Sequence, residues 1–136
     1  MPDSLVLKET ARWLRYATED LDAAITLQSG IPRHSCLLAQ QSAEKAIKSI
    51  YVFLDQPVPK SHDFDMLRNL LPGNWDIKTH FVSLSDLSVW AVESRYPGNA
   101  PEAAAQDASN AVLLAKEVLF CVKNDLKRNG FTRAMP

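Results

Sequence analysis

The sequence has little glycine and little cysteine, and each shortage excludes a kind of site. Four glycines are too few for a glycine-rich phosphate loop, and none forms the Gly-x-Ser-x-Gly turn that exposes a nucleophilic serine. Cys36 and Cys121 lie in segments of helical pattern, far from any CxxC spacing, which favours buried thiols over a disulfide. His34 and His80 have no carboxylate or cysteine at ligand spacing, so the sequence predicts no metal and no cofactor.

Long apolar runs and an excess of charge are also absent. No run approaches the roughly 18 residues of a membrane span, and the first residues lack the charged-then-apolar pattern of a signal peptide. Lys and Arg number 15 against 16 Asp and Glu, a net charge of -1, which argues against a protein that coats nucleic acid electrostatically. A local basic patch is compatible with this balance. We therefore expect a cytoplasmic protein with no membrane partner.

Apolar residues recur at helical spacing along the chain, and no segment has the alternation of a strand. The chain of 136 residues has the length of one domain, 1–136, and its composition is ordinary for a globular protein. The pattern predicts helices over about 4–29, 32–55, 64–71 and 77–94 and from about 101 onward. The basic residues from about 126 are expected to fray.

Two sets of apolar residues lie away from the predicted core stripes. Trp13, Tyr16, Ala23 and Leu27 form a second band on the first helix, and Leu113 and Phe120 lie opposite the alanine-rich side of the last. Because a monomer needs no such surface, these residues predict an oligomer. Trp75, in a predicted loop, is the tryptophan with most freedom to stack on a base.

The second helix carries polar residues on and beside its core stripe. Gln40 and Glu44 project in the arc of the apolar residues, Lys48 to its edge and Lys45 to the far side. A buried carboxylate needs a partner. Glu44 and Lys48 suit an i,i+4 pair, worth about 0.3–0.5 kcal/mol if exposed, which we favour over a phosphate site at the two lysines. His62, in Ser61-His62-Asp63, suits a helix cap better than a general acid.

Three short segments carry a family resemblance: Gln-Gln-Ser-Ala-Glu-Lys-Ala-Ile-Lys at 40–48, Ser-His-Asp at 61–63 and Arg-Tyr-Pro-Gly at 95–98. In this order and spacing the sequence resembles the HEPN family over roughly residues 5–125. The resemblance implies an all-α, antiparallel four-helix bundle with one short extra helix, dimerising through long helices. It also implies a minimal nucleotidyltransferase as partner, often as a toxin–antitoxin pair, and binding of nucleotides or RNA.

Many HEPN proteins are metal-independent ribonucleases in which an Arg is followed, after four to six residues, by a His. The histidines here are His34, His62 and His80, and none has an Arg at that distance upstream; no His follows Arg95. Because the motif is absent, the sequence does not predict an enzyme. The alternative is a ribonuclease with an altered site that uses Arg95 with His62 or His80.

Arg95 and Tyr96 are the leading candidates for a binding site. The guanidinium can hold a phosphate bidentately and the ring can stack on a base, with Lys45, Lys48 and His62 nearby and Glu44 and Gln40 as support. A structural interpretation is equally open: Arg95 leaves the helix end to pair with Glu44, and Tyr96 packs under the loop.

Overall fold

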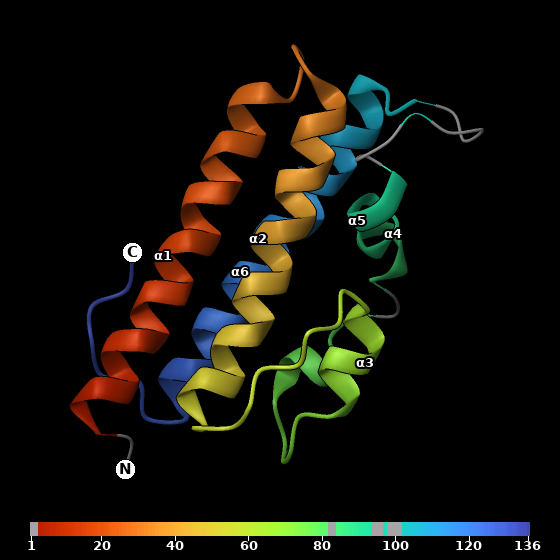
Figure 1. Cartoon of the computed structure of the whole chain (residues 1–136). Coiled ribbons are helices and arrows are strands. Elements are labelled where there is room, and N and C mark those ends of the chain that lie inside the picture. Colours follow the sequence, from red (N-terminus) through yellow and green to blue (C-terminus); the bar gives the residue numbers. More distant parts are fainter. Residues whose placement is uncertain (1–2, 82–83, 94–96, 98–101) are drawn as a thin grey trace.

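The architecture is entirely helical in the part of the chain that the computed structural model describes, residues 3–81, 84–93, 97 and 102–136. Three long helices pack together: α1 (Ser4–Leu27), α2 (Pro32–Phe53) and α6 (Ala105–Arg128). The short elements α3 (Phe64–Asn69), η1 (Asp76–Lys78), α4 (Ser85–Ser88) and α5 (Trp90–Glu93) cover α2 and α6 on the side away from α1 (Figure 1). The predicted all-α fold is confirmed.

Direction alternates along the chain in this arrangement. α2 and α6 run from the top to the bottom of Figure 1, whereas α1 and the α4–α5 segment run upward. α2 is in contact with both α1 and α6 and with the short helices, and most of its residues are buried. Side chains on different sides of α2 therefore pack against different helices. This packing fixes the orientation of α2 and of the polar residues that it carries.

Small residues let α1 and α2 approach closely. Ala17 and Ala24 on α1 are fully buried, and two buried hydroxyls cross the interface to their backbones. Ser42 Oγ donates to the Ala17 carbonyl at 2.6 Å, and Ser35 Oγ donates to the Ala24 carbonyl at 2.6 Å. These hydrogen bonds satisfy polar groups that burial would otherwise make costly, so they fix how α2 faces α1.

The fourth long helix predicted over about 77–94 is not continuous. Leu84 and Leu87 are fully buried, as their helical spacing predicts, and Phe81 and Trp90 of the same predicted stripe pack against the core. The described residues nevertheless form η1, α4 and α5. The Ser88 side chain accepts from the Phe64 backbone N–H at 3.3 Å. This hydrogen bond ties α4 to the start of α3, 24 residues earlier.

α6 extends past residue 126, where the sequence predicts fraying to begin, although most side chains from Lys127 onward are exposed. α6 continues to Arg128, and Phe131 is buried with its ring centroid 6.3 Å from that of Phe53. Trp75 lies on the same Phe53 ring, edge-on at 6.2 Å, and is also buried. The prediction that Trp75 is free to stack on a base is therefore wrong, because this aromatic corner encloses it.

Asp125 joins α6 to η1. Its fully buried carboxylate accepts hydrogen bonds from the backbone N–H groups of Asp76 at 2.9 Å and Ile77 at 3.0 Å, and it pairs with Arg128. The first backbone N–H groups of a helix have no acceptor within the helix, and this carboxylate, from a distant part of the chain, is the acceptor for two of them.

No helix of the described residues has the length and apolar character that crossing a membrane requires.

Candidate functional site

Glu44, on α2, is the centre of a polar cluster. Gln40 Nε2 donates to Glu44 Oε1 at 2.7 Å, and Lys48 Nζ donates to Glu44 Oε2 at 3.0 Å. Both partners are one helical turn away on α2, where i,i+4 side chains lie on the same face. His62, just before α3, completes this Glu44 cluster with Nδ1 2.7 Å from Glu44 Oε1. The structure thus brings together four of the predicted site residues.

Burial and charge act in opposite directions on Glu44. Its side chain is 13% exposed, and burial alone would raise the pKa of this carboxyl. Hydrogen bonds from His62 and Lys48, with one from Gln40, outweigh that effect and hold the pKa of Glu44 below its ordinary value. The cluster therefore has a carboxylate that stays ionised beside a lysine and an imidazole.

Gln40 has an unused acceptor within this cluster. The residue is fully buried, and its Oε1 has no hydrogen-bond partner within the described structure, although its Nε2 is bonded to Glu44. An unsatisfied buried acceptor is unfavourable. A hydrogen bond donated to Gln40 Oε1 would therefore contribute more free energy than the same bond at the surface.

Lys48 is more buried than expected for a residue at the edge of the core stripe, where the sequence predicts it. Its side chain is only 9% exposed. The Glu44 carboxylate compensates the ammonium, so the aliphatic stem can pack against α2 neighbours. The predicted i,i+4 pair with Glu44 is confirmed, but as a largely buried pair.

Lys45 belongs to a different surface. It pairs with Asp20 on α1 and, with Arg12, Trp13 and Tyr16, lines a shallow pocket of about 290 Å³ between α1 and α2. The side chain of Lys45 therefore does not join the Glu44 cluster in the described structure. Asp20 was missed as its partner, because pairs 25 residues apart follow from helix packing and not from spacing.

Arg95 and Tyr96 lie outside the described residues. Both the phosphate-binding role and the Arg95–Glu44 pair therefore stay predictions. Glu44 has three partners in the described part of the chain, so it already has the partners that a buried carboxylate requires.

Within the described part of the chain, no group of three His, Cys, Asp or Glu side chains is placed to hold a metal ion.

We expect Glu44→Gln to destabilise the domain by about 2 kcal/mol at pH 7, because it leaves the buried Lys48 ammonium without its counter-charge. The pKa of Glu44 is lowered on folding, so its stabilisation is present above the ordinary value of 4.5 and is lost as the pH falls through the lowered value. Urea denaturation at pH 7 and pH 3 checks this. The difference in unfolding free energy between wild type and variant should be smaller at pH 3 than at pH 7. An equal difference at the two pH values would contradict the stabilising role of the Glu44 carboxylate.

The HEPN domain signature matches residues 10–125, and the chain belongs to the HEPN domain family. Two solved structures are similar. The crystal structure of TT1696 from Thermus thermophilus is 27% identical, covers 86% of this chain and 98% of that one, and has a TM-score of 0.77. ST0689, an archaeal HEPN homologue, is 28% identical, with 85% and 95% covered and a TM-score of 0.67. The comparison with curated proteins gave no match.

Proposed function

We propose that this HEPN domain is a homodimeric interaction module that binds a nucleotidyltransferase-type partner, in a pair of the toxin–antitoxin kind, and that Lys48 and His62 of its Glu44 cluster take a nucleotide or RNA. The observation that carries the proposal is on α6, where Leu113 is 59% and Phe120 69% exposed. Two large apolar side chains this exposed on one face of a helix favour a face that a partner covers.

Leu113 and Phe120 are aligned on α6. They are seven residues apart, which is two turns or about 10.5 Å, and they fall on one line along the helix. A two-fold axis between them would place Leu113 of one protomer against Phe120 of its partner, and the reverse. That exchange of contacts is what an isologous dimer interface requires.

A second apolar surface is available for a different protein. Trp13 and Tyr16 lie on α1, the pocket that they line is largely apolar, and Arg12 and Lys45 stand at its edge. The Arg12 and Arg15 guanidinium groups each lie 5.4 Å from the Tyr16 ring centroid. Aromatic residues with arginine are typical of the centre of protein interfaces. We assign this α1 surface to the nucleotidyltransferase-type partner.

Lys48 and His62 of the Glu44 cluster suit an anion. The Lys48 ammonium has three donors, of which one reaches Glu44, and the His62 ring is 48% exposed. With Arg95 and Tyr96, predicted to hold a phosphate and stack on a base, these groups would form a site for a nucleotide or an RNA end.

Sizing with light scattering tests the module. A dimer at micromolar concentration supports it, and a monomer contradicts it.

Incubation with single-stranded RNA in the same samples tests the ribonuclease alternative, since intact RNA at high protein concentration argues against catalysis.

Calorimetric titration with a nucleoside triphosphate and a short single-stranded RNA tests the ligand site. We expect saturable binding that weakens at the higher of two salt concentrations, because phosphate contacts release counterions. Arg95→Ala should weaken it roughly tenfold or more, as expected for a lost charged hydrogen bond. Arg133→Ala, which removes an exposed arginine of the C-terminal segment, is the matched control. Equal affinity in wild type and Arg95→Ala would remove Arg95 from the site.

A further inference from the structure

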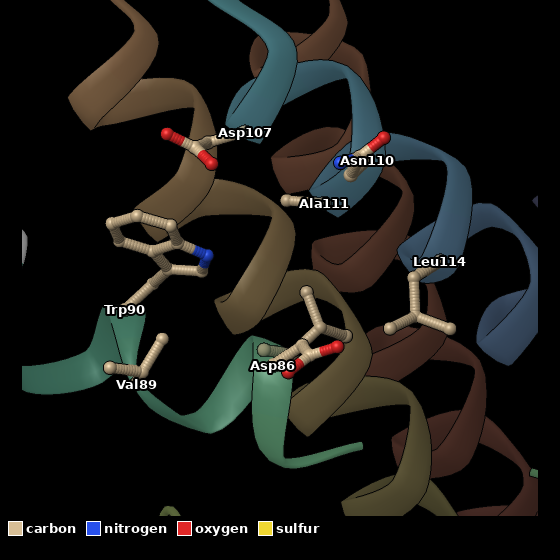
Figure 2. Close-up of a pocket in the computed structure, with 8 residues that line it drawn as sticks. Asp86, Val89, Trp90, Asp107, Asn110, Ala111 and Leu114 are labelled. Carbon is tan, nitrogen blue, oxygen red and sulfur yellow. The ribbon is translucent and has the colours of Figure 1, made fainter. Parts of the chain in front are cut away.

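A second pocket lies between the α4–α5 segment and α6, and its described lining residues include none of the Glu44 cluster (Figure 2). Its volume is about 310 Å³, and the residues that matter for its chemistry are Asp86 from α4, Trp90 from α5 and Asp107, Asn110 and Leu114 from α6. This volume is at the small end for ligand pockets and suits a group the size of a side chain.

Two carboxylates line this pocket without a counter-charge among its described lining residues. Figure 2 shows Asp107 and Asp86 on opposite sides of the space. Asp107 Oδ2 accepts from the Ala104 backbone N–H at 2.8 Å, which leaves Oδ1 available. No Lys, Arg or His of the described chain lines the pocket, and none of the ion pairs found there includes either aspartate. The described residues therefore leave two negative charges facing the space.

An aromatic wall and an apolar floor accompany these charges. The Trp90 indole forms one side of the pocket (Figure 2), and Val89 and Leu114 contribute accessible apolar surface. The face of an indole attracts cations, and a cation held between the two carboxylates is attracted by both. Phosphates, in contrast, would be repelled by both aspartates.

We propose that this pocket binds an organic cation, a primary ammonium or guanidinium group on a short aliphatic stem. The cation lies against the Trp90 ring, and the Asp86 and Asp107 carboxylates hold its charge from two sides. The stem contacts Leu114. This site is opposite in charge to Lys48 and His62 and does not depend on the proposed function.

Nuclear magnetic resonance titration of the full chain with 1,4-diaminobutane tests this site, with 1,4-butanediol as the neutral probe of matched length. We expect saturable shifts centred on the Trp90 indole N–H, assigned by its loss in Trp90→Phe. Asp86→Asn and Asp107→Asn should each weaken binding roughly fivefold, as expected for a partly exposed ion pair, and the double variant should abolish it. Asn can keep the hydrogen bond to Ala104, so the α6 start should stay folded.

Asp22→Asn is the matched control, because Asp22 is an exposed aspartate on α1 outside this pocket. Equal weakening by Asp22→Asn, or equal binding of the diol, would overturn the site and indicate general charge attraction. Absence of any shift with the diamine and with an acetylated Gly-Arg-Gly amide would also overturn it. Tighter binding of the peptide would identify a protein side chain as the natural cation, and tighter binding of the diamine a free amine.

Discussion

Asp125→Ala is expected to lower the free energy of unfolding by about 3 kcal/mol. The substitution leaves the backbone N–H groups of Asp76 and Ile77 without acceptors, and Arg128 loses the partner that it has on α6. Each buried donor without a partner costs about 1–3 kcal/mol. Urea denaturation followed by circular dichroism measures the loss.

Two controls separate this effect from a general loss of charge. Asp125→Asn keeps one acceptor and should cost less than alanine, while Asp22→Ala on the surface of α1 should change stability by less than about 0.5 kcal/mol. An unfolding free energy for Asp125→Ala within that same range of wild type would contradict the account.

Leu113→Glu combined with Phe120→Glu is expected to convert the proposed dimer into a monomer. Both side chains are exposed in the protomer, so the cost falls on association and not on folding. The carboxylate introduced at position 113 of one protomer would face the carboxylate introduced at position 120 of its partner, which should raise the dimer dissociation constant at least roughly a hundredfold. Analytical ultracentrifugation over a concentration series measures this constant.

Tyr16→Glu is the matched control for that experiment. It introduces one carboxylate on the α1 surface, where we expect the dimer to persist and binding of the nucleotidyltransferase-type partner to weaken. If the α6 double variant stays dimeric and Tyr16→Glu becomes monomeric, the two surfaces have been assigned in the wrong order.

The long helices could be predicted from the sequence because their apolar periodicity extends over many turns. α1 and α2 begin at Ser4 and Pro32, as predicted, and end within two residues of the predicted bounds. The fourth helix could not be predicted correctly by the same signal. Leu84 and Leu87 keep the helical spacing although the segment is broken, since core-facing positions can recur across short separate turns.

The candidate site was predictable only in part. Gln40, Glu44 and Lys48 share a helix, so their proximity follows from i,i+4 spacing. The arrival of His62 at Glu44 depends on where the chain returns after α2, across 18 residues. The pocket between α4 and α6 depends on tertiary packing in the same way, because Asp86 and Asp107 come from separate helices.

His62 is held from two directions. Its ring contacts Glu44 on α2, and its carbonyl accepts a hydrogen bond from Ser88 Oγ on α4 at 3.3 Å. The preceding connection from Asp55 to Lys60 lies largely at the surface. Since a longer surface loop adds only a small closure entropy, residues inserted there should leave the imidazole where it is. This connection is therefore the natural point at which to lengthen the chain, or to attach a label, without moving the site.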